Sequence, residues 1–461
     1  MTWRERYATQ PEILDYANHV ADRFGLRDGI QLSTRVVAAV FSDDDERWTI
    51  ETDTGERWRA PQLVMASGCL SLRKQPDFPG LDTFAGDRYT TSAWPSEGVD
   101  LTGRRVAVIG TGSSAIQAIP LIAEQAEHLT VFQRTANFSV PANNAPLGEE
   151  LVRDLKAAYP AYRERARHTF FGVPVSPGGD AGAAVDEASF RQTLDARWAK
   201  GGAAAMMTAY ADVLTDAASN DRVADYLRER IREIVDDPET AELLCPDDHP
   251  VGTKRLCVDT GYYATYNREN VTLVGLRRTP IVEITPTGVR TTEAHHACDA
   301  IVFAIGFDAM TGALLDVDIR GRGGVSLRDA WAAGPRSYLG LAVAGFPNLW
   351  TITGPGSPSV LTNMMVAIEQ HVEWVADCIA HLRERGLRSA EATPEAQADW
   401  VRHVAEVGDT TLYPRASSWY VGANVPDKPR VFLPYIGGLH VYRARCDEIA
   451  RAGYTGFALR P

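Results

Sequence analysis

A glycine-rich turn between an apolar run and a helical pattern is the stretch of this sequence best suited to bind a ligand. Residues 106–109 are all apolar, which is typical of a buried parallel strand, and residues 113–127 carry apolar side chains at helical spacing. The residues between and just after them form the G-x-G-x-x-A pattern of a dinucleotide-binding turn, in which glycines let the backbone approach a pyrophosphate. We therefore expect phosphates at the N-terminus of this helix. The contacts predicted here are Gly110, Thr111, Gly112, Ser113, Ser114 and Gln117.

The residues that follow the next predicted strand favour NADP(H) over NAD(H). An NAD site usually has an acidic residue about 20 residues after the turn, where it binds the ribose 2′-hydroxyl. This chain instead has Gln133, Arg134 and Thr135 after the apolar residues 129–132. A carboxylate would repel a 2′-phosphate, whereas a guanidinium can donate two parallel hydrogen bonds to one. The alternative is a glycine turn in an unrelated α/β protein, with Arg134 as a surface cation.

Length and composition exclude several classes of protein. The 461 residues are enough for two or three domains, and 45% of them are apolar, which allows a large core. A net charge of −13 argues against nucleic acids and anionic membranes as partners. The six cysteines are scattered without a C-x-x-C pair, so the sequence predicts reduced thiols and no metal site. Because neither a signal peptide nor a membrane span is evident, we expect a cytoplasmic protein.

Strand-like and helical stretches alternate at both ends of the chain, which predicts an α/β fold with open parallel sheets. Residues 145–250 are rich in Ala, Arg, Asp and Glu with helical runs, and we interpret them as a helical insertion. Other helices are expected at residues 10–24 and 361–385, and strands at 30–36, 37–41, 48–52, 62–66, 129–132, 281–284, 289–291, 299–305 and 349–353.

Several separate motifs resemble those of the flavin-dependent Baeyer–Villiger monooxygenases, and the resemblance extends over essentially the whole chain. Each motif alone is modest, but their number and order are specific. The type I members that act on phenylacetone and cyclic ketones look most similar. The matching stretches are residues 6–14, the connector with Phe84, Gly86, Trp94 and Pro95, residues 131–135, Lys254-Arg255 before residues 259–263, and residues 306–312, 354–359 and 419–424.

This resemblance implies an NADPH-dependent flavin monooxygenase. In the family, NADPH reduces FAD, O2 is taken up as a C4a-peroxyflavin, and one oxygen atom is inserted into a ketone to give an ester or lactone. The implied fold is α/β, with two Rossmann-like nucleotide-binding domains and the helical insertion. The expected division is an FAD domain in two parts (1–103 and 299–461), an NADPH domain in two parts (104–144 and 253–298) and the insertion (145–252).

The resemblance also implies roles for particular residues. Arg255 matches the active-site arginine, which stabilises negative charge beside the flavin. Lys254 resembles a second contact to the 2′-phosphate, and Trp419 the residue that closes over the nicotinamide nucleotide. The FAD-side contacts implied are Val36, Ser67, Asp308 and Met364. The alternatives are a solvated basic pair for Lys254-Arg255, core packing for Met364 and a buried anchor for Trp419.

The sequence also departs from the family pattern. Thr90 stands where the connector motif has a histidine, and Asn143 replaces an arginine found in many members. The glycine fingerprint for FAD is absent, together with an aspartate that orients the active-site arginine. The explanations are a missing N-terminal segment, a separate chain that supplies it, or a degenerate NADP-binding relative without oxygenase activity. A flavin-dependent N- or S-oxygenase is a further alternative, against which Arg255 and the connector argue.

Overall fold

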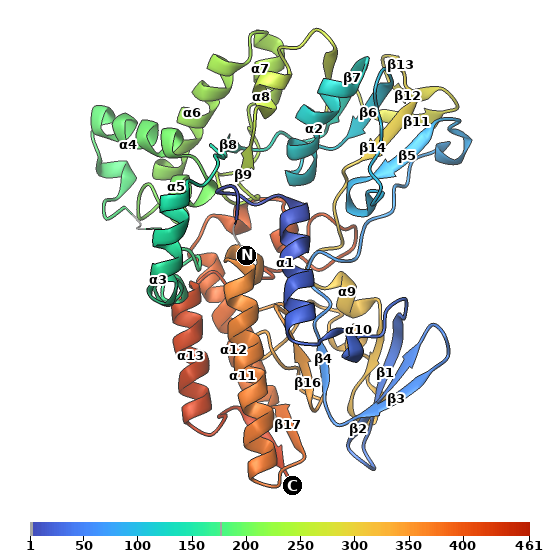
Figure 1. The fold of residues 1–461 in the computed structure, drawn as a ribbon, viewed down its shortest axis with the longest axis vertical. Coiled ribbons are helices and arrows are strands. Elements are labelled where there is room, and N and C mark those ends of the chain that lie inside the picture. The colour runs from blue at the N-terminus through green and yellow to red at the C-terminus, as the bar shows by residue number, and fades with distance from the viewer. Residues whose placement is uncertain (1–2, 176–177) are drawn as a thin grey trace.

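The computed structural model describes residues 3–175 and 178–461, and they form two regions stacked along the long axis of the molecule (Figure 1). The upper region in Figure 1 is built from the middle of the chain. The lower region combines N-terminal strands with C-terminal strands and helices, so the chain crosses between the regions more than once.

A five-stranded parallel sheet forms the centre of the upper region, in the order β10-β7-β6-β14-β5. Its strands are β5 (Asp87–Thr90), β6 (Arg105–Ile109), β7 (His128–Gln133), β10 (Val271–Gly275) and β14 (Ala300–Phe303). Helix α2 (Ser113–Gln125) packs on the sheet through Ile116 and Ile119, which are buried in one cluster with Val106 and Val108 of β6. A parallel sheet is covered on both faces, which explains the continuous apolar run of β6. The predicted strand, turn and helix are confirmed.

Helices make up most of residues 145–250, as the composition of this stretch predicts. They are α3 (Glu149–Arg167), α4 (Glu187–Lys200), α5 (Ala203–Met207), α6 (Ala217–Ile234) and α7 (Pro238–Leu244). Phe190 and Leu194 of α4 pack with Val223 and Leu227 of α6 in a separate core. Strands β8 (Ser139–Pro141) and β9 (Cys257–Asp259) pair in parallel beside this core, and α8 (Tyr262–Thr265) comes next. A small antiparallel sheet follows, with β11 (Ile281–Thr285), β12 (Gly288–Thr291) and β13 (His295–Ala297).

The lower region contains three small sheets and the long C-terminal helices. One sheet has the order β15-β1-β2-β3, and two further pairs are β16 with β4 in parallel and β17 with β18 antiparallel. The strands are β1 (Val36–Ser42), β2 (Arg47–Thr52), β3 (Arg57–Ala60), β4 (Leu63–Met65), β15 (Asp318–Arg320), β16 (Leu349–Thr351), β17 (Ser389–Ala392) and β18 (Phe457–Arg460). The helices are α9 (Gly312–Leu315), α10 (Leu327–Ala330), α11 (Met364–Glu384), α12 (Pro394–Asp409) and α13 (Leu439–Arg451). Within the described ranges, no helix is long and apolar enough to cross a bilayer.

The strand predicted at residues 30–36 is wrong. The chain is irregular there, and extended pairing begins only at Val36. Ser33 has a φ of +53°, which interrupts an extended run, and Leu32 is 77% exposed instead of facing a core. The alternation of polar and apolar side chains predicted a half-buried strand, but in the described structure no neighbouring strand pairs with residues 30–35.

A group of apolar side chains near the N-terminus remains uncovered. Helix α1 (Gln10–Arg23) forms as predicted, but Glu12 is its only buried residue. Ile13, Leu14 and Phe24 are exposed, and so is Val64 of β4. Among the described residues, β4 pairs with β16 alone, which leaves the other edge of this parallel pair open. Such an edge and such apolar surface are normally covered by further structure.

Candidate active site

The glycine turn after β6 has the geometry of a phosphate-binding site. Gly110 has a φ of +111°, and a Cβ there would lie 2.5 Å from the Ala304 carbonyl oxygen, so only glycine fits. A Cβ on Gly112 would meet no atom within 4 Å, which leaves open space above this residue. Gly112 caps α2 in an extended conformation and no side chain caps the helix, so its first N–H groups are free for an anion.

The predicted contacts around this turn occupy its exposed side. Ser114 and Gln117 are exposed on the first turns of α2, and Gln117 donates to the Ser113 carbonyl oxygen at 3.1 Å. Thr111 is buried and donates to the Thr135 carbonyl oxygen at 2.9 Å, which ties the turn to the end of β7. The turn and the end of β7, both predicted as dinucleotide contacts, therefore lie together.

Three cationic side chains gather near the end of β7. Arg134 is exposed there and pairs with no carboxylate of the described residues. Burial lowers the pKa of Lys254; Asp248, 3.6 Å from its Nζ, opposes that shift and the charge of Arg134 adds to it. Burial and Arg134 likewise lower the pKa of Lys74, whose Nζ donates to the Asn424 carbonyl oxygen at 2.8 Å. Cations held together at some cost suit a phosphate.

Lys74 is the member of this group that the sequence did not identify. A single lysine in an irregular connector carries no recognisable signal, and only the fold brings it near Arg134 and Asn424. Asn137 is another residue near the site that the sequence did not identify. Its amide donates to the Arg255 carbonyl oxygen, and its Oδ1 is buried without a partner.

The strand pair β8–β9 places Arg255 beside the dinucleotide turn. Cys257, two residues further on, begins β9, and its Sγ lies 3.1 Å from Oγ of Ser113 at the start of α2. The Arg255 guanidinium extends in the other direction, where Nη1 donates to the Val360 carbonyl oxygen at 3.0 Å. The predicted phosphate site and the predicted active-site arginine are thus joined by one short segment.

Arg255 lines a cavity of about 260 Å³ with mostly apolar walls. Two buried tyrosines share this cavity: burial raises the pKa of Tyr420 to about 12 and that of Tyr413 well above its usual value, and the nearby Arg255 charge opposes both shifts. Both phenols are therefore neutral, and Arg255, whose side chain is solvent-exposed in this structure, supplies the positive charge on the cavity wall. The remaining lining residues are Phe171, Val173, Ala203, Ala204, Met207, Gly252, Leu256, Val360, Leu361, Thr362 and Asn363.

Two of the predicted flavin and nicotinamide contacts pack near this cavity. Met364, at the start of α11, and Trp419 are half-buried against one apolar cluster that includes Val360 and Tyr420. The rings of Trp419 and Tyr420 are 4.1 Å apart. Met364 and Trp419 are therefore brought close to the walls around Arg255.

The other predicted flavin contacts lie elsewhere. Ser67 follows β4, Asp308 is paired with Lys428 at 2.6 Å, and Val36 begins β1 outside the buried clusters of the described chain. The turns after β4 and β16 meet at the carboxyl edge of one parallel pair, the usual place for a nucleotide in an α/β sheet. The described residues carry no second glycine fingerprint at that edge, so their fit to FAD is partial, whereas the turn after β6 and the nearby cations suit the phosphates of NADP.

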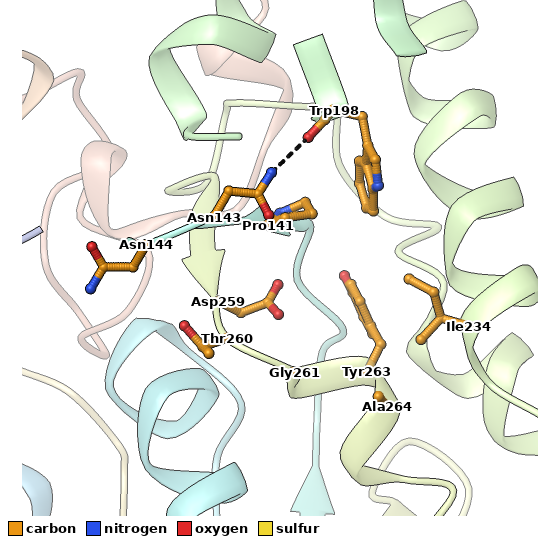
Figure 2. Close-up of a pocket in the computed structure, with 10 residues that line it drawn as sticks. All are labelled: Pro141, Asn143, Asn144, Trp198, Ile234, Asp259, Thr260, Gly261, Tyr263 and Ala264. Atoms are coloured by element: carbon orange, nitrogen blue, oxygen red, sulfur yellow. Dashed lines mark hydrogen bonds between the residues drawn. The ribbon is translucent and has the colours of Figure 1, made fainter. Parts of the chain in front are cut away.

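A second cavity, of about 390 Å³, lies between β8, β9, α4 and α8 (Figure 2). Its walls include Asn143, Trp198, Asp259 and Tyr263, and none of its lining residues is shared with the Arg255 cavity.

A parallel sheet with a dinucleotide turn and cations near its end is typical of pyridine-nucleotide-dependent oxidoreductases. Residues 1–148 match the family model described as pyridine nucleotide-disulphide oxidoreductase. A Baeyer-Villiger monooxygenase of Pseudooceanicola batsensis is 40% identical over 98% of this chain and 83% of its own length. The phenazine N-monooxygenase PhzNO1 of Lysobacter antibioticus is also 40% identical, over 99% of this chain and 84% of its own length.

Solved structures agree. An oxidised steroid monooxygenase bound to NADP is 51% identical and has a TM-score of 0.95, with 100% of this chain and 86% of that chain covered. The OTEMO complex with FAD and NADP is 38% identical with a TM-score of 0.96 over the same shares. The chain belongs to the type I Baeyer–Villiger monooxygenase family, whose members use FAD and NADPH to insert an oxygen atom into ketones. The predicted family, α/β fold, enzyme class and cofactors are confirmed.

Proposed function

We propose that this chain converts a ketone into an ester or lactone in the cavity lined by Arg255. The observation that carries the proposal is the Arg255 guanidinium, held by the Val360 carbonyl in a small cavity with mostly apolar walls. A fixed cation stabilises negative charge that develops on a reacting oxygen, and this stabilisation grows when bound cofactor and substrate displace water from the exposed Arg255 side chain. FAD supplies the oxygen chemistry when it is bound.

Residues of the chain itself bind the nucleotide and exclude water from the cavity. Arg134, Lys254 and the N-terminus of α2 bind the phosphates of NADPH, with Lys74 as an added cation. Leu361 and the buried Tyr413 and Tyr420 exclude water from the cavity. Trp419, half-buried against Tyr420, closes the nicotinamide end.

Product analysis with a matched variant tests the role of Arg255. The chain, together with the segment proposed below to complete the flavin site, is supplied with FAD, NADPH and a panel of ketones, and ester formation is measured beside NADPH consumption. Loss of one group that stabilises a developing oxyanion costs about 100- to 1000-fold in rate, so Arg255→Ala should lose ester formation and keep NADPH consumption. Arg268→Ala, at an exposed position, is the control. Ester formation that survives in Arg255→Ala would refute the assigned role.

N-oxygenation is a second candidate because the phenazine N-monooxygenase is as similar to this chain as the first Baeyer–Villiger relative. The same assay decides between them when phenazine is added to the panel. N-oxide formation without ester formation favours the second candidate.

We also propose that a segment outside residues 1–461, on the same polypeptide or a separate one, completes the flavin site. The support is physical: β4 has an open edge in the described structure, and Ile13, Leu14, Phe24 and Val64 expose apolar surface. Residues 1–461 alone should bind NADP+ and retain little FAD, as measured by calorimetry and flavin absorbance. Stoichiometric FAD on this chain alone would contradict the proposal.

The division of the chain remains part of this proposal. The FAD domain is expected at residues 1–103 and 299–461, the NADPH domain at 104–144 and 253–298, and the insertion at 145–252. A cytoplasmic location, with a small ketone and O2 as partners, also remains a prediction.

A further inference from the structure

The cavity in Figure 2 lies apart from the Arg255 cavity. Its floor is the segment from β9 into α8, with Asp259, Thr260 and Tyr263, and its opposite wall is formed by Trp198 of α4 and by Asn143. Its volume of about 390 Å³ is within the range of small-molecule sites. The mechanism proposed for Arg255 uses none of its lining residues.

Asp259 gives this cavity a carboxylate without a cationic partner. Oδ2 accepts from the Ser139 hydroxyl at 2.5 Å and Oδ1 from the Tyr262 N–H at 3.0 Å, so the side chain is fixed in place. Among residues 3–175 and 178–461, no lysine, arginine or histidine forms an ion pair with it. Burial raises the pKa of Asp259, and only hydrogen bonds from Ser139 and the backbone, without any cationic side chain, oppose that shift.

Aromatic rings flank this carboxylate. The Tyr263 hydroxyl accepts from the Ser139 N–H at 3.1 Å and donates to the Asn137 carbonyl at 3.2 Å, so it is already engaged within the protein. The indole of Trp198 lies across the cavity in Figure 2. Aromatic faces attract cations, and the attraction grows where water is excluded.

We propose that this cavity binds a small organic cation, a guanidinium or primary ammonium group on a short apolar body, with its charge against Asp259 and its body between Trp198 and Tyr263. Asp259 is the single carboxylate among the lining residues, which suits a monovalent organic cation better than a divalent metal ion. The Asn143 amide oxygen at the wall is a further acceptor for N–H groups.

Two probes of equal shape and different charge test the proposal. Calorimetry on the purified chain compares n-butylguanidinium with the neutral n-butylurea. We expect the guanidinium to bind at least tenfold more tightly than the urea. Asp259→Asn should remove that difference while its amide oxygen still accepts the hydrogen bond from the Tyr262 N–H. Asp236→Asn, at an exposed position of the same region, should leave it unchanged. Equal binding of both probes, or full guanidinium binding to Asp259→Asn, would overturn the proposal.

A second variant keeps the test decisive if Asp259→Asn fails to fold. Ala264 is exposed on the rim of the cavity, so Ala264→Arg introduces a tethered guanidinium, whereas Ala264→Gln introduces a shorter polar side chain without charge. Binding of n-butylguanidinium should fall at least fivefold in Ala264→Arg relative to Ala264→Gln. Equal affinity in these two variants counts against the site. Unchanged NADP+ affinity in the presence of the probe separates this cavity from the dinucleotide site, whereas competition with NADP+ would refute a separate site.

Discussion

Removing Arg134 should weaken NADP+ binding and leave NAD+ binding almost unchanged. The side chain is exposed at the end of β7 and pairs with no carboxylate in the described chain, so its loss breaks no internal ion pair. A charge-assisted hydrogen bond contributes about 1.5–3 kcal/mol, which predicts a loss of roughly 10- to 150-fold in affinity for Arg134→Ala. NAD+ has no 2′-phosphate and should lose less than about twofold.

Lys254→Ala should weaken NADP+ binding less than Arg134→Ala does. The Lys254 charge is shared with Asp248 at 3.6 Å, and burial and Arg134 lower its pKa. We expect a loss of about 5- to 10-fold, and a double variant that loses less than the product of the two single losses, because we propose that both cations contact one phosphate.

Isothermal titration of NADP+ and NAD+ at two salt concentrations measures these losses. Arg290→Ala, exposed on β12, is the matched control and should bind both nucleotides as the unmodified chain does. The Arg134 effect should shrink at high salt because exposed charges are screened. If Arg134→Ala loses NADP+ and NAD+ affinity equally, the 2′-phosphate argument is refuted.

Three further predictions concern the fold. His371 is buried, and burial lowers its pKa to about 3, so between pH 6.5 and pH 3 only the unfolded state gains the proton. The free energy of unfolding should therefore fall by about 1.4 kcal/mol for each pH unit below 6.5, down to pH 3. Urea unfolding at pH 7 and pH 5 should show this fall, and His371→Asn should remove it. Gly110→Ala places a Cβ 2.5 Å from the Ala304 carbonyl oxygen and should lower both the melting temperature and NADP+ affinity, with either value unchanged counting against the turn geometry. Ile119→Ala, at a fully buried position, should lower the free energy of unfolding by about 2–5 kcal/mol in denaturant titration, and a loss under about 1 kcal/mol would contradict its core position.

The sequence predicted best where one local pattern determines the structure. The strand, turn and helix from β6 to α2 combine an apolar run, two glycines and helical spacing, and each part agrees with the fold. The sequence was a poorer guide where contacts with residues distant in the chain determine the structure. Residues 30–36 alternate like a strand, yet in the described structure no strand lies beside Leu32, and α1 is amphipathic without a core to cover its apolar face. Only tertiary packing brings Lys74 and Trp198 to the sites proposed for NADPH and for the organic cation.

The segment from Arg255 to Asp259 accounts for how the separate sites are arranged. Asn137 donates to the carbonyl of Arg255 and to Sγ of Cys257, and that sulfur also lies 3.1 Å from Ser113 at the start of α2. Four residues after Arg255, Asp259 faces the second cavity. Because β9 pairs with β8 and the Cys257 side chain contacts Ser113, a shift of Arg255 along its chain would disturb the start of α2. The segment that contains Arg255 therefore links the direction of the guanidinium to the turn at which we propose that NADPH binds.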